Sequence, residues 1–152
     1  TTTRQGVDRF EKDVLSYAPD LLIIGYGMND PGTSLEEYKG MIGQMIERYR
    51  QKVDNGNVIL ISPMLPNVET NWCVLQPQFE KVLEELTQEN DFCALAPMTS
   101  LHREILKQGK RYRDMTGNNV NHPNDFIVRV YAQAVLTALL GDEFAEDFAS
   151  ED

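Results

Sequence analysis

The 152-residue sequence is poor in the residues that build disulfide frameworks and metal sites. It has two cysteines, Cys73 and Cys93, and two histidines, His102 and His122. These are too few for a disulfide framework, and their spacing matches no common set of metal ligands. There is also no run of about 18 apolar residues, which a membrane-spanning helix needs. We therefore expect no metal, no cofactor and no membrane span.

Basic residues are also scarce, since 14 lysines and arginines stand against 24 aspartates and glutamates. The formal net charge of −10 argues against nucleic acid or an anionic membrane surface as a partner, because both favour clustered basic residues. The end of the chain carries much of the excess. We predict an acidic, solvated tail over residues 142–152, whose charged residues are Asp142, Glu143, Glu146, Asp147, Glu151 and Asp152.

Phosphate-binding motifs are missing too. The sequence has neither Gly-x-Gly-x-x-Gly nor Gly-Lys-Ser/Thr, which ranks a flavodoxin-like nucleotide binder last among the alternatives. The length fits one domain, which we place at residues 1–141 ahead of the tail. The chain opens on three threonines instead of a methionine and shows no signal-peptide pattern, so we expect a piece of a longer protein.

Short apolar runs alternate with amphipathic helical patterns along the chain. The runs at 21–24, 58–61 and, more weakly, 92–96 are typical of buried strands. Helical spacing of apolar residues surrounds them, most regularly over 34–53 and 126–139. This alternation predicts an α/β fold, a three-layer α/β/α sandwich with a parallel sheet. A short helix over 101–107 should present His102 to solvent, and we give that histidine no role.

Gly27-Met28-Asn29-Asp30 directly follows the first apolar run. In parallel sheets the ligand site lies beyond the carboxyl ends of the strands. Gly27 permits a close backbone approach, and the Asn29 amide can donate a hydrogen bond to a developing oxyanion. These residue types also form ordinary turns after strands, which is the simpler interpretation of this segment alone.

His122 is the second candidate. It ends a polar loop, Pro123 favours an extended backbone at His122, and a long amphipathic helix follows. A general base needs such a rigid support. The alternative is a loop histidine bonded to neighbouring asparagines, and the sequence offers four: Asn118, Asn119, Asn121 and Asn124.

Together, the two segments resemble motifs of the GDSL-type (SGNH) serine esterases. Gly27-Met28-Asn29-Asp30 is similar to the family's third block, and Asn119-Val120-Asn121-His122-Pro123 to the fifth. The resemblance implies an SGNH hydrolase fold, with Asn29 as an oxyanion donor, Gly27 as the motif glycine and His122 as the base that deprotonates a catalytic serine. It also implies hydrolysis of a small or carbohydrate ester that carries a short acyl group, acetyl above all, through an acyl-serine.

Two positions depart from the family pattern. Asn119 stands where the family has the aspartate that orients the histidine, and Asp114, Asp125 or a backbone carbonyl of residues 116–121 are other candidates for that role. Replacing the triad aspartate by asparagine costs about 10⁴ in kcat in a well-studied serine protease. The alternative function is therefore a catalytically inactive ligand-binding domain on the same scaffold.

The nucleophile is the larger departure. The family's Gly-Asp-Ser motif, on its first strand, has no match here, and neither does Gly-x-Ser-x-Gly. Ser62 is the one serine at a predicted strand end, but it precedes a proline and matches no nucleophile motif, so we expect a structural role for it. We expect the first strand and the nucleophile to lie outside this chain, which alone should be inactive.

Overall fold

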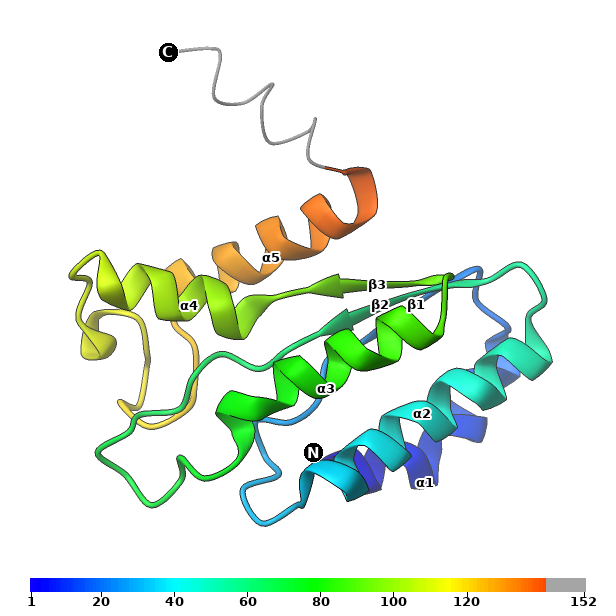
Figure 1. The fold of residues 1–152 in the computed structure, drawn as a ribbon, viewed down its shortest axis with the longest axis horizontal. Helices are drawn as coiled ribbons and strands as arrows, with labels where there is room; N and C mark the ends of the chain where they lie inside the picture. The colour runs from blue at the N-terminus through cyan, green and yellow to red at the C-terminus, as the bar shows by residue number, and fades with distance from the viewer. Residues whose placement is uncertain (142–152) are drawn as a thin grey trace.

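The computed structural model describes residues 1–141, and the predicted acidic tail at 142–152 lies outside this range. The described chain alternates strands and helices as predicted (Figure 1). Its elements are α1 (Thr3–Asp13), the 3₁₀ turn η1 (Leu15–Tyr17), β1 (Leu21–Ile24), α2 (Leu35–Lys52), β2 (Asn57–Ile61), α3 (Gln76–Glu89), β3 (Cys93–Ala96), α4 (Met98–Lys107), the 3₁₀ turn η2 (Tyr112–Asp114) and α5 (Asp125–Leu140).

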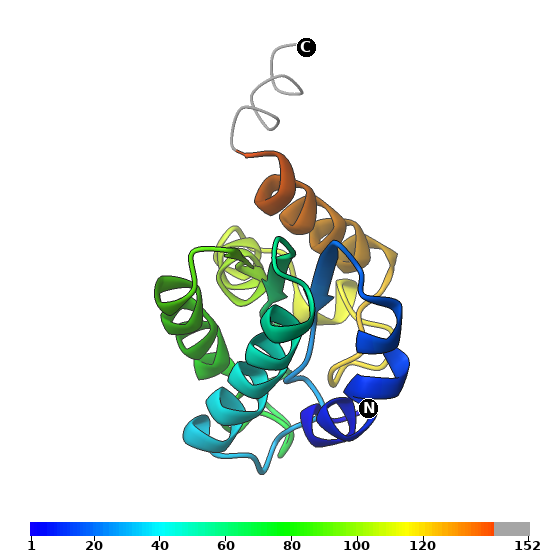
Figure 2. The same cartoon turned by 90° about the vertical axis from the view of Figure 1, so that its right-hand side faces the viewer.

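The three strands form a parallel sheet in the order β1-β2-β3. Helices α1, α2 and α3 lie on one face of the sheet and α5 lies on the other (Figures 1 and 2). The predicted three-layer α/β/α architecture is confirmed. Because the strands are parallel, their carboxyl ends meet at one edge, and the loops after β1 and β2 start from that edge.

The main core lies between the sheet and helices α1 to α3. Its largest members are fully buried, and the Tyr38 and Phe79 rings stack with centroids 4.0 Å apart. A smaller cluster joins Ile59 and Ala96 of the sheet to Ala134 of α5. Strand β1 pairs only with β2 in the described chain, and Ile23 on it is 47% exposed. Strand β1 is therefore an edge strand of the described sheet, and a further strand beside it stays a prediction.

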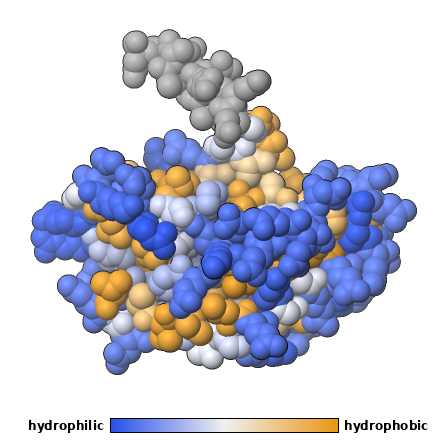
Figure 3. Space-filling model, in the orientation of Figure 1, coloured by the Kyte–Doolittle hydropathy of each residue, from blue (hydrophilic) through white to orange (hydrophobic). Residues whose placement is uncertain are grey.

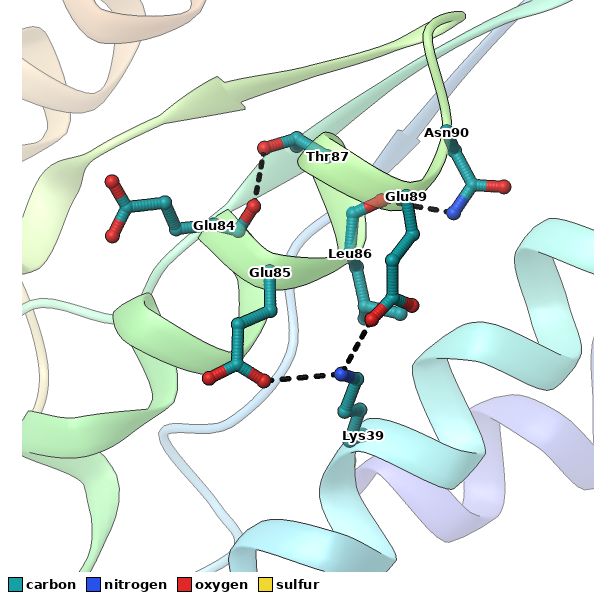
Figure 4. Close-up of polar contacts among 7 residues, drawn as sticks. All are labelled: Lys39, Glu84, Glu85, Leu86, Thr87, Glu89 and Asn90. Carbon is teal, nitrogen blue, oxygen red and sulfur yellow. Dashed lines mark hydrogen bonds and ion pairs between the residues drawn. The ribbon is translucent and has the colours of Figure 1, made fainter.

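Helices α2 and α3 are also linked on the surface. The Lys39 ammonium of α2 donates to Glu85 and Glu89 of α3 at 3.0 and 2.8 Å (Figure 4). Hydrogen bonds to Glu89 and then Glu85 raise the pKa of Lys39. The contact is exposed to solvent, so it adds little to stability.

Most of the viewed surface is polar, and an apolar area lies near the carboxyl end of α5 (Figure 3). Leu139 and Leu140 are about half exposed there. Among residues 1–141, no helix is both long and apolar enough to span a membrane.

Helix α4 begins at Met98, three residues before the predicted start, because distant side chains cap it. The Ser62 hydroxyl accepts from the Thr99 amide at 2.9 Å and donates to Glu80 at 2.6 Å. The Glu80 carboxylate also accepts from the Ser100 amide at 3.1 Å. Together these groups bind amides of the first turn, which would otherwise have no partner. The structural role predicted for Ser62 is confirmed.

The prediction that His102 faces solvent is wrong. Its side chain is fully buried, because the chain after α4 turns back and places Tyr112 beside it, with ring centroids 5.6 Å apart. His102 Nδ1 accepts a hydrogen bond from the Leu65 amide at 3.1 Å, while its buried Nε2 has no partner in the described chain. Burial lowers the pKa of His102 to about 4, so the ring is neutral at pH 7.

Candidate active site

The segment after β1 turns sharply at Gly27, whose φ of 116° is disfavoured for residues with a side chain. A Cβ atom there would lie 2.9 Å from the Phe79 ring and 3.3 Å from both Pro63 and the Tyr38 hydroxyl. Tyr38 also donates to the Tyr26 carbonyl at 3.0 Å. These three side chains therefore leave no room for a side chain at position 27, and the predicted close approach of the Gly27 backbone to a ligand stays a prediction.

Gly27 and Asn29 line one pocket of about 300 Å³ at the carboxyl edge of the sheet. The exposed Asn29 carboxamide donates one hydrogen bond, to the Thr1 carbonyl at 3.2 Å. A carboxamide has two N–H groups, so a second donor remains for a ligand. The other wall comes from the loop after β2 and from α5, through Pro63 and Tyr131.

Asp30 has a structural task that the motif alone did not indicate. Its carboxylate is 4% exposed and accepts from the Thr3 amide at 3.0 and 3.2 Å and from the Thr3 hydroxyl at 2.9 Å. Thr3 belongs to the first turn of α1, where a negative charge is favourable. Asp30 thereby fixes the end of the Gly27–Asp30 segment, called the glycine segment below, to the start of α1.

His122 lies in an exposed turn, and no hydrogen bond involves its ring within the described chain. Its backbone is held well: the amide donates to Asn118 Oδ1 at 2.9 Å, and the carbonyl accepts from the Gly117 amide at 2.9 Å. The next residue, Pro123, bridges to Thr116. The alternative that we weighed, a loop histidine bonded to neighbouring asparagines, is therefore present. The bond involves the backbone amide of His122 and not its ring.

The turn also contacts the loop after β2 through Asn67, which is 6% exposed. Its amide donates to the Val120 carbonyl at 2.9 Å, and its side chain donates to the Asn119 carbonyl at 2.8 Å. The Tyr112 hydroxyl lies 2.9 Å from the Val120 carbonyl and 3.0 Å from that of Leu65. His122 is thus tied to the same edge of the sheet as Asn29, although it does not line the Asn29 pocket.

None of the candidate carboxylates orients the His122 ring in this structure. Asp114 binds Arg111 at 2.8 and 3.2 Å, and Asp125 binds Arg129 at 3.1 Å. Asn119 has a φ of 55°, a conformation that asparagine tolerates, and it lines a separate pocket of about 400 Å³. Gly27 and Asn29 share a pocket, and the convergence of His122 with them on one cleft, which the family resemblance requires, stays a prediction.

Sequence reasoning named Asn118 as one of four asparagines that could bond to His122, but it missed Asn67 as a second residue that holds the histidine loop. The run of asparagines around His122 was a signal for Asn118, because these side chains bond to nearby backbone amides. For Asn67, 55 positions before His122, no local pattern gave a signal. Within residues 1–141, no group of three or more His, Cys, Asp or Glu side chains is placed to hold a metal ion.

No protein-family model matches the sequence, and no curated protein sequence does either. Solved structures match closely in shape. Axe2, an acetylxylan esterase from Geobacillus stearothermophilus, matches with a TM-score of 0.77 and 21% identity, over 93% of this chain and 69% of Axe2. A candidate GDSL-like lipase from Parabacteroides merdae matches with a TM-score of 0.78 and 21% identity, over 91% of this chain and 68% of that protein.

The Axe2 structures include three described as catalytic mutants, in which a serine, an aspartate and a histidine are each replaced by alanine. That aspartate and histidine are three positions apart in Axe2. At about 20% identity such likeness establishes the fold and leaves the activity open. This chain has the α/β/α fold of GDSL/SGNH hydrolases, which the two sequence motifs predicted.

Proposed function

We propose that this chain supplies the oxyanion-binding and histidine parts of a serine esterase. The observation that carries the proposal is the pocket formed by Gly27 and Asn29 at the carboxyl edge of an SGNH-type sheet. A second one supports it: Asn119 and His122 have the three-residue spacing of the aspartate and histidine replaced in the Axe2 catalytic mutants.

In the proposed reaction a serine hydroxyl attacks the ester carbonyl while its proton passes to the His122 imidazole. The tetrahedral oxyanion accepts a hydrogen bond from the free N–H of the Asn29 carboxamide. Collapse expels the alcohol, which takes the proton from His122 and leaves an acyl-serine. Water, deprotonated by His122, then releases the acid and restores the serine.

The substrate class is proposed by analogy. The pocket of about 300 Å³ next to Asn29 has room for a short acyl group, and its size does not select one. Axe2 is described as an acetylxylan and acetyl-xylooligosaccharide esterase, which favours acetylated carbohydrate as the ester. We infer an acetyl ester of a saccharide or another small alcohol.

The nucleophile is proposed to come from residues that precede Thr1. Ser62 is engaged by Glu80 and Thr99, and no serine of this chain lies in a nucleophile motif. Thr1 lines the Asn29 pocket, so a preceding segment would enter directly beside it. The other four serines likewise lie outside any nucleophile motif; they are Ser16, Ser34, Ser100 and Ser150.

A fluorophosphonate probe tests this proposal on a longer version of the protein that includes the residues encoded before Thr1. We expect one upstream serine to be labelled, and His122→Ala to abolish both labelling and hydrolysis of p-nitrophenyl acetate. The present chain alone should hydrolyse this ester no faster than its own His122→Ala variant. Strong turnover by the present chain, with label on one of its five serines, would contradict the proposal.

A catalytically inactive ligand-binding domain is the second candidate, favoured by the absence of a bonded orienting group at the His122 ring in the described chain. It requires that no upstream serine reacts with the probe. In that case acetylated xylo-oligosaccharides should still bind, and Asn29→Ala should weaken binding measured by calorimetry.

A further inference from the structure

One oxygen organises the whole backbone of the turn that carries His122. Asn118 Oδ1 accepts hydrogen bonds from three consecutive amides, those of Val120, Asn121 and His122, at 3.0, 3.0 and 2.9 Å. On its other side, Asn118 Nδ2 donates to the Asn121 side chain at 3.0 Å. Residues 118–122, called the histidine turn below, thus close around a single carboxamide.

The three bonds fix more than the path of the chain. A side-chain oxygen that binds amides two to four residues ahead replaces the backbone acceptors that a helix or strand would provide. The positive φ of Asn119 (55°) lets the chain wrap around that oxygen. With the His122 amide at 2.9 Å from Asn118 Oδ1, the direction in which the His122 side chain leaves the backbone is set by Asn118.

Asn67 attaches the histidine turn to the loop after β2, because it donates hydrogen bonds to the Asn119 and Val120 carbonyls. Asn118 therefore shapes the turn and Asn67 places it. No carboxylate of the described chain bonds to the His122 ring, so the hydrogen-bonded turn is the feature of the described chain that can orient the imidazole.

We propose that Asn118 is the positioning residue of His122, acting through the backbone of the histidine turn and not through the imidazole ring. This inference rests on the proposed esterase function, because a general base must be oriented towards the group that it deprotonates. A misplacement of a catalytic group by about 1 Å can cost on the order of 10²-fold in rate. Removing the Asn118 carboxamide should therefore reduce the rate far more than the loss of one surface contact would.

The test compares three substitutions. Asn118→Ala removes the acceptor, whereas Asn118→Asp keeps an oxygen for the three amides, and the Asn121 carboxamide can turn over to donate to it. Asn90→Ala is the matched control, because Asn90 makes one side-chain bond to the Leu86 carbonyl, at 2.9 Å, at the end of α3. All three should leave the far-ultraviolet circular dichroism spectrum unchanged.

The first measurement is NMR on the present chain. Hydrogen exchange of the Val120, Asn121 and His122 amides should quicken by about 10-fold or more in Asn118→Ala and stay near the unsubstituted rates in the other two variants. With two histidines in the chain, the signals of the His122 ring are those that disappear in His122→Ala. Its signals should shift in Asn118→Ala alone.

The second measurement is hydrolysis by the longer protein. We expect kcat to fall on the order of 10²-fold in Asn118→Ala, with KM within about twofold, and to recover in Asn118→Asp. An unchanged His122 ring in Asn118→Ala, or an equal loss of kcat in Asn90→Ala, would overturn the inference. If the longer protein shows no His122-dependent hydrolysis, the esterase proposal fails, and the NMR results still decide whether Asn118 orients His122.

Discussion

The glycine segment and the histidine turn lie at the same edge of the sheet but are held by different forces. The glycine segment is enclosed by packed side chains, with Phe79, Pro63 and Tyr38 around Gly27 and a buried Asp30 at its end. Most of the histidine turn is exposed, with Asn121 buried, and it is held by hydrogen bonds that Asn118 accepts and Asn67 donates. Steric enclosure resists small movements more strongly than solvent-exposed hydrogen bonds do, so the two regions should respond to different perturbations.

The largest effect is expected from Gly27→Ala in the glycine segment. The added methyl group would lie 2.9 Å from Phe79, and φ would remain unfavourable at 116°. Overpacking and left-handed strain together predict a loss of about 2 to 5 kcal/mol of unfolding free energy. Gly117→Ala, beside the histidine turn, is the control, since its added methyl group meets nothing within 4 Å. Denaturant unfolding of the two variants compares the regions directly. Equal losses of unfolding free energy would contradict the difference between the enclosed glycine segment and the exposed histidine turn.

Acid should act on the histidine turn first, through His102. Its pKa is about 4 in the folded chain and about 6.5 when unfolded, so the unfolded state binds more protons between these values. The stability that the neutral ring contributes is complete above pH 6.5 and declines as the pH falls towards 4, by roughly 3 kcal/mol in total.

Because His102 accepts from Leu65, two residues before Asn67, amides of the histidine turn should lose exchange protection between pH 6.5 and 5. Those of the glycine segment should keep it over the same range. His102→Gln, which keeps an acceptor and does not titrate, is the control and should flatten this pH dependence. If both regions lose protection together, His102 supports the whole fold and not one loop.

A smaller loss is expected from Asp30→Ala, which leaves the Thr3 amide and hydroxyl without their partner. Hydrogen bonds to a charged group are worth roughly 1.5 to 3 kcal/mol, and the melting temperature should fall accordingly. Asp8→Ala is the control, because Asp8 is exposed and lies on α1, the helix that also contains Thr3. This substitution should change stability by less than about 0.5 kcal/mol. No difference between the two variants would mean that Asp30 does not hold the glycine segment to α1.

The smallest effect on stability should come from Asn119→Asp, because aspartate also tolerates the φ of 55° and the bond from Asn67 goes to the backbone carbonyl. In the longer protein we expect the esterase rate to rise or stay unchanged, as a carboxylate at this position can accept from the imidazole. A steady-state assay with p-nitrophenyl acetate measures it. A large loss of rate would show that the Asn119 carboxamide makes an essential contact of its own.

The sequence by itself determined the layered α/β/α fold and the order of its elements. Short apolar runs and period-3.6 apolar patterns are local, so β1, β2 and the approximate ends of α2 and α5 could be predicted from neighbouring residues. The same patterns placed Gly27 and Asn29 at a strand end, and the structure brings both into one pocket.

Only the tertiary structure decided which side chains are buried around the site and which hold it. The start of α4 depends on Ser62 and Glu80, which are 36 and 18 positions before Met98, and the burial of His102 depends on a chain that returns over α4. The attachment of the histidine turn by Asn67 likewise joins residues more than 50 positions apart. Such contacts leave no periodic trace in the sequence, because they depend on loops that meet only after the sheet has assembled.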